Sequence, residues 1–296
     1  MKKILFILAI TVGLWSCTEE IPTSTIDKYS EKLVVNEYFN NIEPFSIQVS
    51  VSKDAYKDAD PYLLTNAEAN VLLTENGNPI PLTFNSFDRV FTSNLKPQPG
   101  KNYNLTVTAK NFGSITSSGA LPNNIANKSA LYIENGGIDM QGNKSDLLKL
   151  TFKDDAKTKD YYKLNFYYYS ELVDKFNAFD FELKDILTAV NTIKTRDGGF
   201  LFSDESFNGK EKTFTAVPPF GIVASNTGAK YLIQIQRLND DFWKYNTSLE
   251  QYRGGLTGGI GGSGSNIFGG AVIVYSNIHN GLGIFAGSNI ESDTLK

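Results

Sequence analysis

The sequence predicts an all-β protein, with an N-terminal immunoglobulin-like β-sandwich followed by a second β-rich domain that has short helical connectors. Three observations lead to this class. Runs of Val, Ile, Thr, Tyr and Phe recur along the chain, apolar and polar residues alternate within them, and turn-forming residues separate them. At 296 residues, 41% of them hydrophobic, the chain is long enough for one large or two ordinary domains with buried cores.

Residues 1–16 predict a signal peptide. Two lysines precede an apolar run at residues 4–14, which is too short to cross a bilayer core of about 30 Å. The LWSC segment that ends at Cys17 resembles the lipobox of bacterial lipoproteins, in which the cysteine is acylated. We therefore expect acyl chains on Cys17 to anchor the protein in outer-membrane lipid, with residues 17–30 as a tether. The alternative is an ordinary signal peptide followed by an unrelated cysteine.

The acidic pair Glu19-Glu20 after the cysteine resembles the surface-export signal of Bacteroidota lipoproteins, although a polar tether would have the same composition. We expect an outer-membrane, lipid-anchored protein that is exposed at the cell surface. Loss of the two lysines in residues 1–16 changes the formal charge from −4 to −6, and no block of Lys and Arg follows. This charge argues against nucleic acid as a partner.

Residues 31–124 form the predicted sandwich. A first strand is expected from Leu33, and residues 45–52 alternate apolar and polar side chains with the period of two that marks a half-buried strand. Two apolar runs flank Asn76-Gly77, a pair that tolerates the positive φ angles of a type I′ turn, and so predict a hairpin. Further strands are expected at residues 89–91 and 103–109.

Residues 125–296 form the second predicted domain. Residues 147–152 and 161–169 predict two strands that pair through the charged turn between them. The second strand has aromatic residues on both faces, so either it is covered on both sides or Tyr167 and Tyr169 form a binding platform. Further strands are expected at residues 212–216, 231–238 and 271–275, and helical spacing predicts short helices at residues 186–193 and 242–252.

A glycine-rich segment runs from Gly254 to Gly270, where nine of seventeen residues are glycine. This composition predicts a flexible loop. The alternative is a mobile finger that orders against a ligand or partner, with Gly254, Gly255, Gly258 and Gly259 among its contacts. A loop of this length is uncommon unless it is functional or disordered.

Glycines recur in the terminal segment, at residues 281, 283 and 287. A dinucleotide-binding loop would need a following helix to hold the pyrophosphate, and too few residues remain for one. The pattern instead predicts a bulged or tightly turned strand in which glycine allows two backbones to approach closely.

The sequence offers few groups for catalysis, because it contains one histidine, His279, and one cysteine. We predict a turn or hydrogen-bonding role for His279. The acidic residues Asp154-Asp155, Asp160 and Asp240-Asp241 could bind calcium, but there is no D-x-D-x-D-G loop, which favours charged turns. We therefore predict no catalytic residues, no cofactor and no metal; a hydrolase with an unrecognised carboxylate pair is the alternative.

Several segments together resemble the Bacteroidota lipoproteins of the domain of unknown function 4249 family. They are LWSC, NVLLTENGNPIPL, PGKNYNLTVTA, DYYKLNFYY, FSDESFNGK and YSNIHNGLGIFAG, and the most specific is the stretch from Ser276 to Phe285. The resemblance covers nearly the whole mature chain. It implies an outer-membrane lipoprotein whose gene often lies beside that of a TonB-dependent receptor, with no catalytic residues to carry over.

These observations lead us to expect a non-enzymatic accessory or ligand-binding subunit that works with a TonB-dependent receptor in nutrient capture. The lipid anchor, the scarcity of catalytic groups and the aromatic side chains that can stack on a ligand motivate this expectation. An adhesin or structural surface protein without a receptor partner is the alternative.

Overall fold

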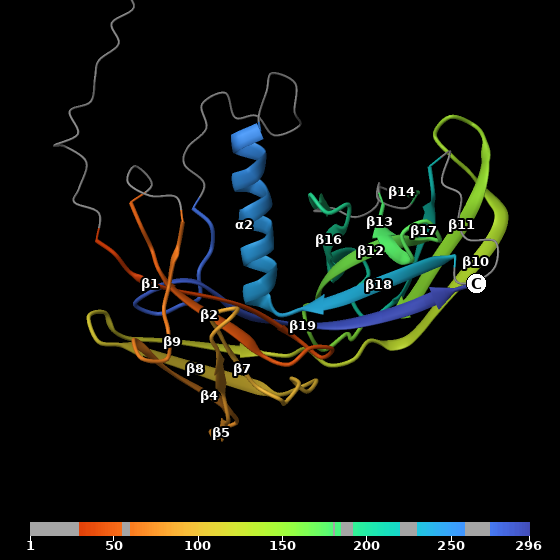
Figure 1. The fold of residues 1–296 in the computed structure, drawn as a ribbon. Helices are drawn as coiled ribbons and strands as arrows, with labels where there is room; N and C mark the ends of the chain where they lie inside the picture. The colour runs from red at the N-terminus through yellow and green to blue at the C-terminus, as the bar shows by residue number, and fades with distance from the viewer. Residues whose placement is uncertain (1–29, 55–59, 180, 185–191, 220–229, 258–272) are drawn as a thin grey trace, which may run out of the picture.

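The computed structural model describes residues 30–54, 60–179, 181–184, 192–219, 230–257 and 273–296. Strands dominate these ranges, which confirms the all-β class (Figure 1). The strands form three sheets, and α2 (Asp240–Thr257) is the one α-helix among the described residues.

The longest sheet has eleven strands, in the order β15-β16-β12-β18-β19-β1-β2-β7-β6, with β13 beside β12 and β3 beside β2. Its strands are β1 (Leu33–Asn40), β2 (Ser46–Val51), β3 (Tyr62–Leu63), β6 (Thr83–Asn85), β7 (Val90–Thr92), β12 (Tyr161–Ser170), β13 (Lys175–Ala178), β15 (Ile193–Lys194), β16 (Phe200–Ser203), β18 (Tyr231–Leu238) and β19 (Leu282–Leu295).

The other two sheets have four strands each. The sheet with the order β5-β4-β8-β9 contains β4 (Ala69–Glu75), β5 (Asn78–Ile80), β8 (Asn102–Ala109) and β9 (Gly113–Ala120). The sheet with the order β10-β11-β17-β14 contains β10 (Ala126–Ile138), β11 (Lys144–Lys153), β14 (Glu182–Leu183) and β17 (Glu211–Val217). A short 3-10 helix, η3 (Asp204–Ser206), follows β16.

Both four-stranded sheets pack on the same face of the long sheet. Alternate residues of β19 point to one face, and this set includes Phe285, which lies in the first core, and Leu295, which lies in the second. Tyr38 and Tyr161 point to the opposite face, where they contact α2. The helix therefore stands on the face of the long sheet that the two four-stranded sheets leave uncovered (Figure 1).

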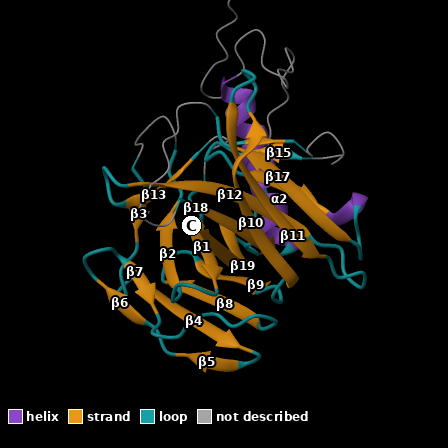
Figure 2. Cartoon of the chain, turned by 90° about the vertical axis from the view of Figure 1, so that its right-hand side faces the viewer, coloured by secondary structure: helices purple, strands orange, loops and turns teal. Residues whose placement is uncertain are grey.

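The first core lies between β1, β2 and β19 on one side and the sheet of β4, β5, β8 and β9 on the other (Figure 2). Aromatic rings fill it: the centroid of Phe39 lies 4.8 Å from that of Phe285 and 5.5 Å from that of Phe45. The predicted hairpin is confirmed, because Asn76 and Gly77 have φ angles of 47° and 88° and join β4 to β5.

The glycines of the terminal segment allow β19 to lie against its neighbours, as the sequence predicts. Gly283 has a φ of +102°, and a Cβ there would lie 1.9 Å from the carbonyl oxygen of Val35. A Cβ on Gly287 would lie 2.4 Å from the ring of Phe39. Side chains at these positions would separate β19 from β1, with which it pairs in parallel.

The predicted pairing of residues 147–152 with residues 161–169 is wrong. β11 pairs with β10 and β17, whereas β12 pairs with β13, β16 and β18. The two strands face each other across the second core, where the rings of Phe152 and Tyr162 have centroids 5.0 Å apart. The charged turn crosses between sheets because Asp154 and Asp160 are buried and bonded to residues far along the chain.

The helical predictions are partly confirmed. Residues 242–252 are helical, but α2 is an 18-residue helix rather than a short connector. Residues 185–191 lie outside the described ranges, and Ile193 belongs to β15 instead of a helix. Of the strand predicted at residues 271–275, residues 271 and 272 lie outside the described ranges. Residues 273–275 pair with no described strand and contact α2 instead.

The long sheet continues across residues 124 and 125, the predicted domain boundary. β19 pairs in parallel with β1 and antiparallel with β18, and so contributes side chains to both cores. The division into domains at residues 31–124 and 125–296 stays a prediction.

Candidate ligand-binding site beside helix α2

Helix α2 begins where local sequence favours a helix start. Asn239 accepts a hydrogen bond from the backbone N–H of Phe242 at 2.9 Å and so caps the helix. Asp240 and Asp241 lie in the first turn, where the helix dipole favours negative charge. The Nδ2 of Asn239 donates to the carbonyl oxygen of Ala120 at 3.2 Å, which fixes the base of the helix against β9.

Aromatic contacts hold the helix upright on the long sheet. Trp243 stacks on Tyr161 of β12, with ring centroids 4.8 Å apart. On the β1 side, Phe242 stacks on Tyr38 at 5.4 Å, and the hydroxyls of Tyr38 and Tyr245 are 2.9 Å apart. These contacts set the distance between α2 and the two strands beneath it.

A pocket of about 370 Å³ lies between one face of α2, strand β12 and the turn that joins β15 to β16. The helix contributes Asn246, Glu250 and Arg253, which follow Trp243 at helical spacing and therefore share its face. The sheet side contributes Lys163, Thr195, Arg196 and Asp197. Every lining residue is polar or charged, so the pocket offers hydrogen-bonding and charged groups to a solute.

Internal bonds fix the sheet side of the pocket. The backbone N–H of Thr195 donates to the carbonyl oxygen of Gly199 at 2.8 Å, and the Thr195 hydroxyl donates to Asp197 Oδ1 at 2.5 Å. Lys163 Nζ donates to Asp197 Oδ2 at 2.7 Å. Burial opposes ionisation of Asp197, but the bonds from Lys163 and Thr195 outweigh this effect and lower its pKa.

The charges of the pocket do not cancel. Lys163 is paired with Asp197, and Arg253 Nη1 is 3.0 Å from Glu250 Oε1. Arg196 is exposed and has no polar partner among the residues that the structure describes. The lining therefore carries one unmatched positive charge in a protein of net negative charge.

A buried amide lies next to this pocket. Asn165 is 2% exposed and follows Lys163 on the same face of β12. Its Oδ1 has no hydrogen-bond partner within the described ranges. Gly199 leaves room for it, since a Cβ at that position would lie 2.5 Å from Asn165 Nδ2. Buried polar groups are normally paired, so the Oδ1 of Asn165 is an exception, although Asn165 itself is not among the residues that line the pocket.

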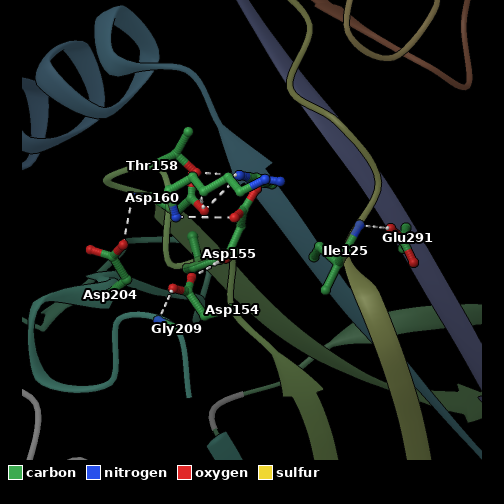
Figure 3. A network of polar contacts seen from close by, with 11 residues as sticks. Ile125, Asp154, Asp155, Thr158, Asp160, Asp204, Gly209 and Glu291 are labelled. Carbon is green, nitrogen blue, oxygen red and sulfur yellow. Dashed lines mark hydrogen bonds and ion pairs between the residues drawn. The ribbon is translucent and has the colours of Figure 1, made fainter. Parts of the chain in front are cut away.

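A cluster of three buried carboxylates lies at one end of the second core (Figure 3). One oxygen from each of Asp154, Asp160 and Asp204 lies within 4.8 Å of the others. Burial raises the pKa of both Asp160 and Asp204, against the hydrogen bonds that each accepts. Carboxylates at this spacing have the chemistry of a calcium ligand set.

The bonds within the cluster favour a structural role. Asp160 Oδ2 is 2.6 Å from Arg237 Nη2, which supplies positive charge inside the protein. Asp154 accepts bonds from the Tyr162 hydroxyl and the Gly209 N–H, at 2.7 and 2.8 Å, and Asp204 accepts the Asp160 N–H at 2.8 Å (Figure 3). The cluster thus joins the turn after β11 to β18 and to the segment that follows β16.

A protein-family model for a domain of unknown function, DUF4249, matches residues 18–294. The chain belongs to the DUF4249 family. The match extends over both cores, α2 and the pocket, so the site lies within the family domain. A search of curated proteins finds no match to the chain. No helix within the described ranges is long and apolar enough to span a membrane.

The residues that the sequence predicts as contacts lie in different places in this DUF4249 protein. Gly254 and Gly255 belong to the last turn of α2, so the predicted loop from Gly254 is wrong at its start. Gly258 and Gly259 lie outside the described residues, as does Cys17.

Tyr167 and Tyr169 are both part-exposed and occupy the β12 face that carries Lys163. The Tyr167 hydroxyl lies 3.4 Å from Gln234 Oε1. Tyr169 donates to Asp174 and packs edge-on against Phe176, with centroids 5.3 Å apart. Neither residue lines the pocket, and their role as contacts stays a prediction.

His279 acts through its backbone, which exchanges hydrogen bonds with Thr116 of β9 in an isolated bridge. Its side chain is exposed. Asp241 accepts hydrogen bonds from the Tyr275 hydroxyl at 2.5 Å and Asn277 Nδ2 at 3.1 Å, so it holds the segment that follows α2 in sequence.

Sequence reasoning missed the pocket residues and Asp204. One signal was present for the helix side, because Asn246, Glu250 and Arg253 form a polar row at helical spacing beyond an aromatic residue. Arg196 and Asp197 occupy a short turn that resembles many polar turns. Their place in the pocket depends on the position of this turn relative to α2, which only the fold creates.

Proposed function

We propose that this DUF4249 protein is a non-enzymatic, lipid-anchored subunit at the surface of the outer membrane, which binds a small polar ligand for a TonB-dependent receptor. The pocket between α2 and the β15–β16 turn carries this proposal. It has the size and the convergent polar groups of a small-molecule site, and its walls are fixed by the Trp243–Tyr161 stack and the Lys163–Asp197 bond.

The membrane attachment in this proposal depends on Cys17. Acylation there would attach the part of the chain that begins with strand β1 at Leu33 to the lipid through a short polar segment. A Cys17→Ala variant should therefore leave the membrane fraction and appear in the soluble fraction with its fold intact.

The partner surface in this proposal is the outer face of β10, an edge strand. Leu131 and Ile133 point away from the second core and are 52% and 36% exposed. Leu147 of β11 lies opposite Ile133 and extends the apolar surface. Apolar groups on an exposed strand edge are typical of a protein contact.

The test is recovery of the tagged protein from its native outer membrane in mild detergent. We expect a TonB-dependent receptor in near-equal amount, and its loss from the Cys17→Ala preparation. A protein recovered alone across several gentle detergents would contradict the receptor partnership and favour an adhesin or a free ligand-binding protein.

A further inference from the structure

We infer that the pocket beside α2 binds a small hydroxylated monocarboxylate, the class that includes uronic and aldonic acids, and that Arg196 binds its carboxylate. The inference rests on the proposed function and deepens it, because it names the ligand class of the same site. It follows from the charges of the pocket, the hydrogen-bonding groups left available and the volume.

The carboxylate position follows from Arg196. Its guanidinium is exposed at the pocket and has no polar partner among the described residues, whereas Lys163 and Arg253 are already bonded to Asp197 and Glu250. A guanidinium presents two parallel N–H donors that match a carboxylate. A ligand carboxylate can therefore bind Arg196 without breaking either existing ion pair.

The acidic residues of the lining explain why we expect the ligand to carry only one negative charge. Asp197 is held ionised by Lys163 and Thr195, and Glu250 is 15% exposed in its ion pair. The formal charge of the five ionisable lining residues is +1. One negative charge neutralises it, whereas a phosphate dianion would leave an excess of negative charge beside Asp197 and Glu250.

The hydroxyl groups follow from the available acceptors. Asn246 donates through Nδ2 to the carbonyl oxygen of Phe242 at 2.7 Å. This bond leaves the Oδ1 of Asn246 able to accept a hydrogen bond from a ligand. Asn165 does not line the pocket and its Oδ1 is buried, so the acceptors open to a ligand hydroxyl are those of the lining itself. A volume of about 370 Å³ is near the lower end of small-molecule sites, which suits a solute the size of one sugar.

The experiment is isothermal titration calorimetry of the acylated protein in detergent, with D-glucuronate, D-gluconate, D-glucose and D-glucose 6-phosphate as probes. We expect binding of glucuronate or gluconate that weakens with added salt. Glucose and glucose 6-phosphate should bind at least about tenfold more weakly, because one lacks the carboxylate and the other carries too much charge.

Variants test the role of Arg196. Arg196→Gln should weaken binding of the carboxylate by roughly ten- to a hundredfold, the range for charge-assisted hydrogen bonds, and Arg196→Lys should restore only part of it. Lys194→Gln is the matched control, since it removes a positive charge from the same hairpin outside the pocket lining and should leave affinity unchanged. Circular dichroism should show the same fold for all three variants.

Three results would overturn the inference: no binding of either monocarboxylate, tighter binding of glucose 6-phosphate, or equal affinity of the wild type and Arg196→Gln. These outcomes are separate from those of the proposed function. A protein that binds glucuronate but leaves the membrane without a receptor keeps the ligand class and loses the receptor partnership. A protein that is recovered with a receptor but binds no monocarboxylate keeps the receptor partnership and loses the ligand class.

Discussion

Trp243 of α2 lies nearly parallel to Tyr161 of β12, with ring centroids 4.8 Å apart and planes inclined by 13°. The polar residues of the pocket come next along the same face of the helix. This stack is therefore the support that holds the helix wall of the pocket at its distance from the sheet.

Replacement of Trp243 by alanine should loosen that wall. We expect the free energy of unfolding to fall by about 2 kcal/mol, since the side chain is only partly buried, and affinity for the pocket ligand to fall with it. Urea denaturation measures the first effect and calorimetry the second. Lys244→Ala, one residue along on an exposed part of the helix, should change the free energy of unfolding and the affinity far less. Equal effects of the two variants would contradict the role of the Trp243 stack in supporting the pocket wall.

Glu37 should make stability depend on pH. Burial raises its pKa from 4.5 to about 7, against a hydrogen bond from the Ser46 N–H. The folded protein therefore binds this proton more tightly than the unfolded chain, so the contribution of Glu37 to stability is fully present below pH 4.5 and is lost as the pH rises to 7. The decline should be about 3 kcal/mol. Urea denaturation from pH 4 to 8 should show a shallower decline for Glu37→Gln, and identical slopes would exclude Glu37 as the source.

Gly283→Ala should disrupt the pairing of β19 with β1. The added Cβ would meet the carbonyl oxygen of Val35 at 1.9 Å, and the positive φ adds strain. We expect a loss of more than about 3 kcal/mol in the free energy of unfolding. Gly113→Ala has a similar positive φ but nothing within 4 Å of its Cβ, and should lose about 1 kcal/mol. Thermal melts of the two variants should differ clearly if the backbone clash matters.

Arg237→Leu should leave Asp160 buried without its cation. The free energy of unfolding should fall by roughly 3 to 5 kcal/mol at pH 7. The loss should be smaller at acid pH, where Asp160 can be protonated in the folded state. The double variant Asp160→Asn with Arg237→Leu should be more stable than Arg237→Leu alone. Urea denaturation of the wild type, Arg237→Leu, Asp160→Asn and the double variant completes the cycle, and additive losses would mean that the pair is not coupled.

In the proposed partnership with a TonB-dependent receptor, the outer face of β10 should determine how much receptor is recovered. Leu131→Lys together with Ile133→Lys places charge on this exposed face, and should lower the amount of co-purified receptor roughly tenfold while the protein stays folded. Leu72→Lys is the control, because Leu72 is 46% exposed on β4. If the double variant recovers as much receptor as the wild type, the contact lies on another surface.

Local chemistry explains which features could be predicted from the sequence. The Asn76-Gly77 turn and the close approach at Gly283 depend on φ angles that few residues tolerate, so a short stretch of sequence is enough to identify them. Alternation in residues 45–52 similarly identifies β2, because one face of that strand is buried in the first core.

Strand pairing and the pocket depend on contacts that local patterns do not contain. The turn between β11 and β12 has the composition of a hairpin turn, but Asp160 bonds to Arg237, 77 residues away. The pocket joins the turn at Arg196 to helix residues some 50 positions further along. Polar residues at a turn and polar residues on a helix face are both common on surfaces, so nothing in either segment alone indicates a binding site.

The position of β19 between β1 and β18 affects how the chain can fold. Residues 282–295 complete both cores, so neither core can close until the ribosome has made almost all of the chain described here. Contacts this distant in sequence make folding slow and leave a long-lived open state. Truncation before Leu282 should therefore leave both cores open and yield a protein that proteases remove.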